Sequence, residues 1–291
     1  MLSILIPTYN YNVEELVAEL YAQANASNID FEIIIGDDFS DQNIYDRSNL
    51  KNSKLVKIYR NNCSIGRTAM RELLSTKALY NWILYIDSDM IPSQNKYIQN
   101  YINAILENKD IKAFFGGYSY SNQHPDKDRL RFRYGVSRES KSADNREIKP
   151  YRNIYSGNML ISRESFKLTN TSLENRYGLD LAFSSELESK NIPFKHLDNY
   201  TNHMGIDDNY SFLLKSKEAS RTIRYLYDQN LISSKQSKLV WAYKLIEKLH
   251  LTKVVELKGR LFSPIISWLL INFKAPLIIL DFYKLYHFCK K

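Results

Sequence analysis

The chain has 291 residues, enough for one large domain with an appendage or for two small domains. Hydrophobic residues make up 44% and charged residues 25%, which is ordinary for a globular protein. The two cysteines, Cys63 and Cys289, exclude a disulfide framework and a cysteine-rich zinc site, which suits a reducing compartment. The N-terminus lacks the basic segment of a signal peptide, so no signal peptide is expected. The reducing compartment favours a cytoplasmic protein.

The net charge of +8 is spread unevenly along the chain. Residues 1–210 contain 25 Lys or Arg and 27 Asp or Glu, whereas residues 211–291 contain 15 and 5. The positive excess therefore lies in the C-terminal part, and this asymmetry indicates an anionic partner there. A nucleic acid and a membrane surface are the two candidates. Tyrosine is also abundant, at 22 residues, which fits carbohydrate or base stacking or a plain compositional bias.

Strand and helix signals alternate along the first part of the chain. Short apolar runs predict strands at residues 2–6, 31–35, 54–59, 81–86 and 112–117. Apolar residues at helical spacing predict helices over residues 13–24 and 65–76 and around residues 98–106. Such alternation implies βαβ units, so the predicted fold class is α/β with a mainly parallel central sheet.

Residues 119–152 break this alternation, because they are polar and rich in lysine and arginine. A long segment without a core of its own is typical of a functional or disordered loop, so a flexible loop is predicted there. Beyond it, a strand is predicted within residues 154–162, a helix over residues 179–190 and a short strand at residues 193–197.

The C-terminal part, residues 211–291, is predicted to be a basic amphipathic helical extension. Its longest uncharged run, residues 261–273, has 13 residues, whereas a spanning helix needs about 20 apolar residues. Two interpretations remain for this run: a helix that lies in a membrane interface, or a helix packed on the preceding domain.

Two carboxylates one residue apart, Asp87 and Asp89, directly follow the predicted strand at residues 81–86. In an open α/β sheet, ligands bind at the carboxyl ends of the strands. Hard oxygen ligands at such a point suit Mg²⁺ or Mn²⁺, which usually bind one or two carboxylates together with substrate phosphates. The pair therefore suggests a metal-bound diphosphate, and a solvated loop is the alternative interpretation.

Other residues at the same edge of the sheet could bind a nucleotide. Pro7 ends the first strand and places Thr8 and Tyr9 at its carboxyl end, and Asp38 follows the second strand. An aromatic ring and a carboxylate together can hold a nucleobase, by stacking and by accepting an N–H.

A predicted helix start adds two arginines to this group. Gly66 opens the helix, on which Arg67 and Arg71 share one face. A helix N-terminus and an arginine suit phosphate oxygens. A solvated basic face is the alternative, and it is more natural for Arg67 than for Arg71.

Six segments, taken in order, resemble the motifs of family 2 glycosyltransferases, which have the GT-A fold. The first four are I-P-T-Y-N, G-D-D-F-S-D, G-R-T-A-M-R and Y-I-D-S-D. The similarity continues with Gly157-Asn158-Met159-Leu160-Ile161-Ser162-Arg163 and with Tyr177-Gly178-Leu179-Asp180-Leu181, and it covers roughly residues 1–205. It implies a GT-A nucleotide-sugar domain over residues 1–210, followed by the basic helical extension.

The resemblance also implies roles for individual residues. The nucleotide-binding residues would be Pro7, Thr8, Tyr9, Asp38, Arg71 and Asp87. A metal ion, Mn²⁺ or Mg²⁺, would be bound by Asp89 and His203, although a structural histidine is the alternative at position 203. Asp180 would be the general base, and the acceptor side would include Gly157 and Asn158. One departure is Leu179, which stands where the family usually has a further acid.

The implied activity is that of an inverting, metal-dependent glycosyltransferase. The expected donor is a nucleotide sugar, with UDP-sugar preferred, and the expected acceptor is a glycan or lipid-linked molecule in cell-surface polysaccharide synthesis. Residues 119–152 would form an acceptor-side flap. The basic extension would contact an anionic membrane surface rather than nucleic acid, at the inner face of a bacterial plasma membrane.

Three other classes of function remain open at this stage. A nucleotidyltransferase would be expected to carry a glycine-rich loop after the first strand, and residues 7–12 contain no glycine. A phosphatase with a nucleophilic aspartate would have threonine after its acid pair, whereas Met90 and Ile91 follow here. A non-catalytic binding protein with the same fold would have no need of Asp87, Asp89 and Asp180 together.

Overall fold

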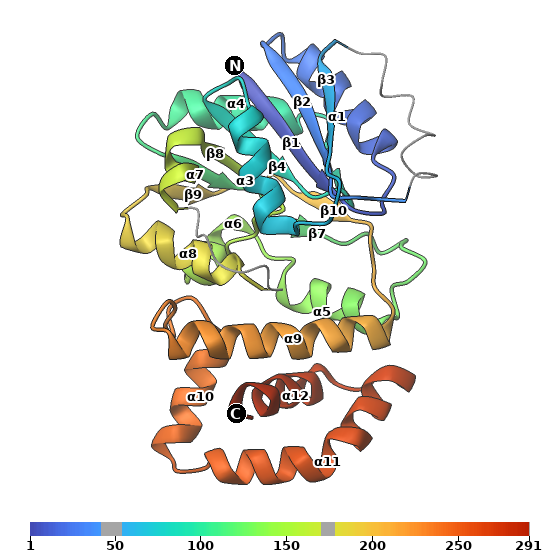
Figure 1. Ribbon diagram of the computed structural model, residues 1–291, viewed down its shortest axis with the longest axis vertical. Coiled ribbons are helices and arrows are strands. Elements are labelled where there is room, and N and C mark those ends of the chain that lie inside the picture. The colour runs from blue at the N-terminus through green and yellow to red at the C-terminus, as the bar shows by residue number, and fades with distance from the viewer. Residues whose placement is uncertain (42–53, 170–177, 291) are drawn as a thin grey trace.

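A seven-stranded sheet forms the centre of the computed structural model, which describes residues 1–41, 54–169 and 178–290 (Figure 1). The strands are β1 (Leu2–Thr8), β2 (Phe31–Asp37), β3 (Val56–Arg60), β4 (Trp82–Ile86), β6 (Ala113–Phe115), β8 (Asn158–Ser162) and β9 (Phe194–His196). Their order is β3-β2-β1-β4-β8-β6-β9. Only β8 runs antiparallel to its neighbours among these described strands. The predicted α/β fold with a mainly parallel sheet is confirmed.

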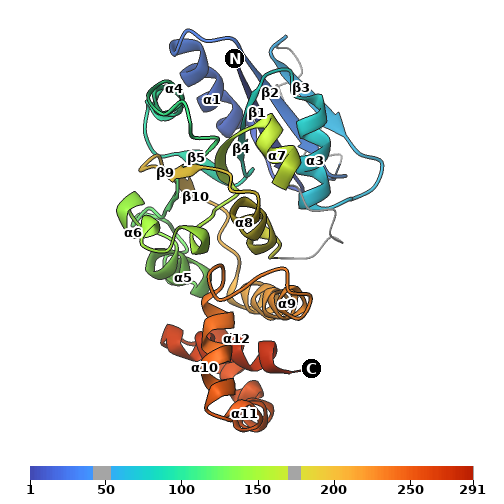
Figure 2. The same ribbon diagram turned by 90° about the vertical axis from the view of Figure 1, so that its left-hand side faces the viewer.

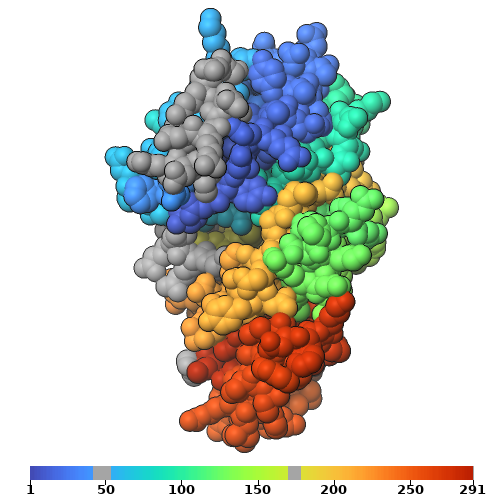
Figure 3. All heavy atoms as spheres, turned by 90° about the vertical axis from the view of Figure 1, so that its right-hand side faces the viewer, coloured from blue at the N-terminus to red at the C-terminus, as the bar shows by residue number. Residues whose placement is uncertain are grey.

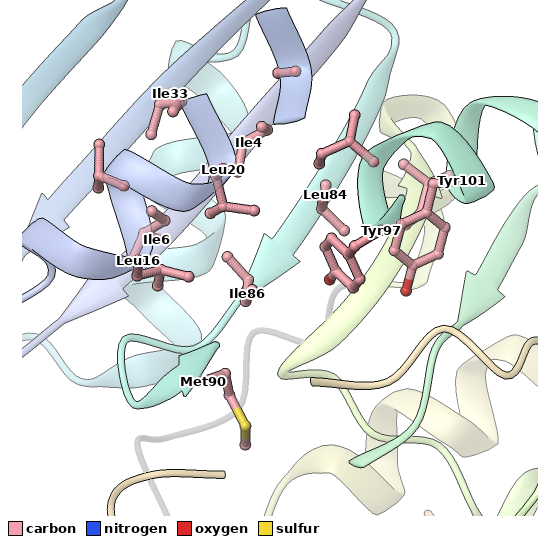
Figure 4. Packing of buried hydrophobic residues seen from close by; sticks show 14 of the residues in the cluster. Ile4, Ile6, Leu16, Leu20, Ile33, Leu84, Ile86, Met90, Tyr97 and Tyr101 are labelled. Atoms are coloured by element: carbon pink, nitrogen blue, oxygen red, sulfur yellow. The ribbon is translucent and has the colours of Figure 1, made fainter. Parts of the chain in front are cut away.

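Helices cover both faces of this sheet, which explains why its inner strands are apolar on both sides. β1 and β2 are buried along their whole length. Helices α1 (Glu14–Ala26) and α4 (Tyr97–Glu107) pack on one face, where Leu16 and Leu20 lie close to Ile4 and Ile6 (Figure 4). Helices α3 (Arg67–Lys77) and α7 (Arg163–Thr169) pack on the other face. The carboxyl ends of β1, β2 and β4 are left open at one edge.

A second, three-stranded sheet follows at that edge. Its strands, in order, are β5 (Met90–Pro92), β10 (Thr201–His203) and β7 (Tyr118–Ser119). The antiparallel pairing of β10 with β5 sets His203 opposite Met90. Strands of two or three residues carry no periodic signal, so the sequence did not predict this sheet. Its effect is to bring a distant part of the chain beside the acid pair that follows β4.

Residues 119–152 differ from the irregular loop that their composition predicted. They contain helices α5 (Leu130–Arg138) and α6 (Ala143–Glu147) and a 3₁₀ helix (Pro150–Arg152). The side chain of Arg146 is fully buried, and its guanidinium donates to the carbonyl oxygens of Phe115 at 2.8 Å and Leu197 at 2.7 Å. A charged residue therefore anchors this segment, which is why a search for apolar periodicity missed its order.

Four helices form the C-terminal part, at the end of the molecule away from the N-terminus (Figures 1 and 2). They are α9 (Asn209–Asp228), α10 (Lys238–Lys248), α11 (Thr252–Asn272) and α12 (Leu277–Cys289). The space-filling view shows that these helices make up that end of the molecule (Figure 3). None of the helices in the described ranges is long and apolar enough to span a membrane.

Two apolar clusters join these helices to the rest of the molecule. In one, Leu179 and Ala182, at the start of α8 (Asp180–Ser189), pack with residues of α9, α10 and α12. In the other, Leu130 of α5 packs with Leu213 of α9 and Leu280 of α12. Helices α9 and α12 are therefore packed on the preceding domain. Residues 261–273, for which two interpretations remained, lie in α11 and directly after it, and Leu270 packs in the second cluster.

Candidate functional site

A cavity of about 410 Å³ lies at the carboxyl ends of β1, β2 and β4. Eight of the residues proposed from the sequence line it: Pro7, Thr8, Tyr9, Asp38, Asp87, Asp89, Asp180 and His203. The other three, Arg71, Gly157 and Asn158, are not part of the cavity wall. The fold thus brings together most of a site whose members are far apart in the sequence.

Two arginines of α3 hold Asp87 in place. Arg71 Nη2 donates to Asp87 Oδ1 at 2.8 Å, and Arg67 donates to Oδ2. Burial by itself would raise the pKa of Asp87, but the two guanidinium groups outweigh it and hold the pKa below its usual value. Asp87 is therefore ionised. The arginines differ from the expectation, because Arg67 lines the cavity while Arg71 is buried behind it.

Asp89 faces the cavity two residues further along. Burial, and next the neighbouring Asp87 carboxylate, raise the pKa of Asp89 to about 6. A cation at this carboxylate would oppose both effects. The chain at Gly205 passes very close, because a Cβ atom there would lie 2.6 Å from Asp89 Oδ2. A glycine at position 205 therefore leaves the room that Asp89 needs.

His203 lies beside Asp89, with 3.7 Å between its Nε2 and Asp89 Oδ2. The imidazole stacks on the ring of Tyr120, with 5.6 Å between the ring centroids and 12° between the planes. Burial, and next the charge of Arg131, lower the pKa of His203 to about 4, so the ring is neutral. Its buried Nδ1 has no hydrogen-bond partner among the described residues. A neutral imidazole with Nδ1 protonated presents a lone pair on Nε2.

This pair fits a divalent cation. A distance of 3.7 Å is too long for a hydrogen bond, and two ligands at about 2.1 Å from one ion can be this far apart. Within residues 1–41, 54–169 and 178–290, no group of three or more His, Cys, Asp or Glu could hold a metal ion. An ion at Asp89 and His203 would therefore need further ligands from a bound molecule, and diphosphate oxygens are suitable.

Asp38 anchors the loop that leads into α3. Its carboxylate accepts from the backbone N–H groups of Ile65 and Gly66, both at 2.8 Å, from Ser64 Oγ at 2.8 Å and from Asn61 Nδ2 at 3.1 Å. Burial by itself would raise the pKa of Asp38, but these hydrogen bonds hold it below its usual value. A carboxylate has about four acceptor positions, so a contact with a nucleobase would have to replace one of these bonds.

Asp180, the first residue of α8, lies on the cavity wall with its side chain 43% exposed. Ser156 donates to its Oδ1, and Arg71 Nη1 lies 3.6 Å from the same oxygen. Arg71 also donates to Ser156 Oγ at 2.6 Å. One buried guanidinium therefore positions both Asp87 and Asp180.

The sequence around Asp180 departs from the family pattern at Leu179, and the structure gives the reason. Leu179 is buried in the cluster that joins α8 to the C-terminal helices. An apolar side chain is needed there because the position serves packing. Tyr177, also part of this sequence motif, lies outside the described residues.

Gly157 and Asn158 lie outside the cavity wall and pack beneath the residues that form it. The side chain of Asn158 is fully buried, and its Oδ1 accepts from the hydroxyls of Tyr97 and Tyr101, each at 2.6 Å. Its Nδ2 donates to two backbone carbonyl oxygens. A Cβ atom on Gly157 would lie 2.1 Å from Asp87 Oδ2. The expected acceptor-side position of Asn158 is therefore corrected, because all of its polar atoms are used inside the protein.

Several wall residues were not assigned from the sequence: Tyr11, Tyr118, Arg131, Glu139, Tyr155 and Lys215. Arg131 and Glu139 belong to residues 119–152 and are joined by hydrogen bonds of 3.0 Å. Lys215 comes from α9 and pairs with Asp207 at 2.8 Å. The abundance of tyrosine was a signal for the aromatic part of this wall, but nothing in the sequence indicated which tyrosines would meet.

Comparison with known proteins agrees with this geometry. The model of the family described as Glycosyl transferase family 2 matches residues 3–169. Chondroitin synthase of Pasteurella multocida (strain Pm70) is 31% identical over 127 residues, and that of Escherichia coli is 32% identical over 124 residues. These alignments cover 42% and 41% of this chain but 13% and 17% of the relatives. The chain thus matches less than a fifth of the length of these curated relatives.

Two solved structures share the fold at low identity. The mannosyltransferase PcManGT from Pyrobaculum calidifontis, in complex with GDP-Man and Mn²⁺, has a TM-score of 0.56 at 10% identity, covering 78% of this chain and 64% of that one. Glucosyl-3-phosphoglycerate synthase from Mycobacterium tuberculosis, in complex with Mn²⁺, UDP-Glc and phosphoglyceric acid, has a TM-score of 0.53 at 13% identity, covering 80% of each chain. These similarities identify the fold as GT-A.

Proposed function

Since the chain belongs to glycosyl transferase family 2 and is a glycosyltransferase, we propose that it transfers a sugar from a nucleotide diphosphate sugar with inversion, assisted by a divalent cation. The observation that carries this proposal is the meeting of Asp89, His203 and Asp180 in one cavity. The cavity thus contains two residues that could bind a cation and a carboxylate that could act as a base. Family membership favours glycosyl transfer over nucleotidyl transfer, phosphatase chemistry or simple binding.

The donor would lie along the carboxyl ends of β1, β2 and β4. Tyr9 is 58% exposed at the cavity wall, so its ring is available to stack on the base. Arg67 faces the cavity and can approach the phosphates, while Asp87 would accept from the ribose. The two solved structures that share the fold are complexes with GDP-Man or UDP-Glc, and we propose a UDP-sugar for this chain.

Asp89 and His203 would hold Mn²⁺ or Mg²⁺ against the donor diphosphate. When bound, such a cation neutralises the negative charge that grows on the leaving nucleotide diphosphate. Gly205 and the stacked ring of Tyr120 position these two ligands. The neutral state of His203 suits it to this role, because only an unprotonated nitrogen can bind a metal.

Asp180 would be the general base. An acceptor hydroxyl is a weak nucleophile, so a carboxylate must take its proton as the new bond to the anomeric carbon forms. Ser156 and Arg71 bind one oxygen of Asp180 and fix its direction. A single displacement of this kind, in which the bond to the diphosphate breaks as the new bond forms, inverts the anomeric centre.

We propose that the acceptor is a glycan or a lipid-linked sugar used in cell-surface polysaccharide synthesis, at the inner face of a bacterial plasma membrane. The names of the curated relatives support a polysaccharide product. Arg131 and Glu139 bring residues 119–152 to the cavity, which supports an acceptor-side position for this segment. Both cysteines are free, which suits a reducing compartment.

The proposal is tested with a panel of nucleotide sugars, each incubated with Mn²⁺ or with EDTA and scored for nucleotide release. We expect release from one donor that requires the metal and is lost in Asp89→Ala. Asp110→Ala, which removes an exposed carboxylate away from the cavity, is the matched control and should keep full activity. Release that is equal in EDTA, or equal in Asp89→Ala, would contradict the proposed mechanism.

A further inference from the structure

Helix α11 has apolar side chains all around its middle, yet only one side of it is covered. Gly259 lies on the covered side, where a Cβ atom would be 2.1 Å from the ring of Tyr286 in α12. Leu270 is the other buried residue of α11. A helix that is apolar on all sides is normally buried. We therefore expect the exposed side of α11 to be covered by another surface.

That opposite side carries an exposed apolar stripe at helical spacing: Val254, Leu257, Leu261, Ile265 and Trp268. Leu257 is 60% exposed, Leu261 62% and Trp268 56%. Trp241 and Leu245 of α10 and Leu249, directly after it, are also exposed and add a second stripe before α11. We define these eight residues as the apolar face. Soluble monomers rarely expose so many large apolar residues on adjoining elements.

The charged residues near the apolar face are mostly positive. Residues 241–274 contain six Lys or Arg and two Asp or Glu. Lys253, Lys258 and Arg260 are exposed beside the stripe of α11, and helical geometry places them on its two flanks, Arg260 and Lys253 on one and Lys258 on the other. This combination of an apolar stripe with cationic flanks is the pattern of a helix that lies in a membrane interface.

We propose that the apolar face of α10 and α11 binds the surface of an anionic lipid bilayer. The aliphatic and tryptophan side chains would enter the boundary between headgroups and acyl chains, while the flanking cations pair with anionic headgroups. A second copy of the chain fits less well, because a two-fold contact would set this cationic surface against itself. This inference does not depend on the reaction that the cavity catalyses.

The experiment measures co-sedimentation of the full-length protein with vesicles of phosphatidylcholine alone or with one third phosphatidylglycerol. We expect binding to the anionic vesicles that weakens as salt rises. The variant Leu257→Ser/Leu261→Ser/Trp268→Ser should bind at least about tenfold more weakly, which corresponds to about 1.4 kcal/mol. The matched control Leu79→Ser/Leu106→Ser/Ile148→Ser removes three exposed apolar residues elsewhere and should bind like the wild type.

A second pair of variants tests the charge. Each cation near an anionic surface strengthens binding by about fivefold, so Lys253→Gln/Lys258→Gln/Arg260→Gln should weaken it strongly. Lys96→Gln/Lys109→Gln/Lys190→Gln, which alters three exposed lysines elsewhere, should have little effect. The inference is overturned if the wild type does not sediment with anionic vesicles, or if the apolar-face variant binds as well as its control. It is also overturned if light scattering shows a dimer that the apolar-face variant dissociates, because the face would then be a subunit interface.

Discussion

The two parts of this molecule place their charges in opposite ways. Around the cavity, charged side chains are paired in fixed directions, as in the contacts of the buried Arg71 with Asp87 and Asp180. In α10 and α11 the cations are exposed and the apolar side chains are exposed beside them. Burying the paired charges around the cavity costs desolvation energy, but it fixes the positions of the side chains. Catalysis requires such fixed positions. Exposed side chains such as those of α10 and α11 can adjust their positions to a partner. Such a surface suits a lipid bilayer, whose headgroups move.

The two parts are nevertheless joined in one packed body. Helix α9 provides Lys215 to the cavity, and its Leu213 packs with Leu280 of α12. α12 in turn packs against α11 at Gly259. An orientation imposed on α11 would therefore be passed to the cavity. The contributions of the two parts can therefore be measured separately.

The largest effect is expected at the proposed base. Asp180→Asn keeps the shape of the side chain but removes its ability to take a proton, so turnover should fall by about 10² to 10⁴. Donor binding and vesicle binding should be unchanged. The measurement is turnover with saturating donor, beside Asp110→Asn as control, and turnover within threefold of the wild type would remove Asp180 from the base role.

The next largest effect is expected for a substitution of the buried Arg146, which anchors residues 119–152. Arg146→Met fills a similar volume but removes the donors of Arg146. The Leu197 carbonyl oxygen loses this hydrogen bond, and the Phe115 carbonyl oxygen keeps only the one from the backbone N–H of Leu197. The free energy of unfolding should therefore fall by about 3–5 kcal/mol. Lys127→Met, an exposed cation in the same segment, should change stability little. Urea unfolding measures both, and equal stability of the two variants would show that Arg146 is not an anchor.

A pH effect follows from His196, whose Nδ1 accepts from Arg146 Nη1 at 3.0 Å and whose Nε2 donates to the Pro150 carbonyl oxygen at 3.3 Å. Burial, and next the charge of Arg146, lower the pKa of His196 to about 4. The unfolded chain, with a pKa of about 6.5, binds this proton more readily than the folded one. Stability is therefore fully kept above about pH 6.5 and falls as pH drops toward 4, by up to about 3 kcal/mol.

The corresponding measurement is the free energy of unfolding at pH 7 and pH 4.5 for the wild type and His196→Gln. The variant should lose less stability between the two pH values, although it is less stable at pH 7. His250→Gln, an exposed histidine, should follow the wild type. A wild-type loss no larger than that of His196→Gln would contradict the neutral assignment of His196.

The smallest effect is expected at an ion pair between the two parts of the molecule. Arg138 Nη2 lies 2.8 Å from Asp281 Oδ2, and both side chains are about one third exposed. Partly exposed pairs contribute about 0–1 kcal/mol, so Asp281→Asn should reduce stability by no more than this. Leu280→Ala, in the apolar cluster beside it, should cost about 2–5 kcal/mol. The opposite order in urea unfolding would mean that charge, rather than apolar packing, holds the two parts together.

Local features of the sequence were enough for much of the fold and for part of the site. Asp87, Asp89 and Tyr9 follow directly after apolar strands, so their position at the sheet edge could be predicted. The β-strands of the parallel sheet were visible because they are buried on both faces. The alternation of elements then fixed the fold class.

Features that depend on long-range contacts could not be predicted in the same way. The position of His203 beside Asp89 results from the pairing of two strands of three residues, so the family resemblance indicated it and no local pattern did. Arg67 and Arg71 share a helix face, and only the packing of α3 decides which one reaches the cavity. Arg146 and Asn158 are polar residues in buried positions, so hydropathy placed the first in a loop and gave no sign that the second is structural.

The most direct test of the central claim is calorimetric titration of UDP and GDP into the protein with Mn²⁺ or with EDTA, for the wild type and Asp89→Asn. This measurement needs no acceptor. We predict that the wild type binds one nucleotide, UDP by our proposal, at least about tenfold more tightly with Mn²⁺, a gain of about 1.4 kcal/mol, and that Asp89→Asn loses this gain. Equal affinity with and without the metal, or an unchanged gain in Asp89→Asn, would contradict a cation-assisted nucleotide-sugar site in this cavity.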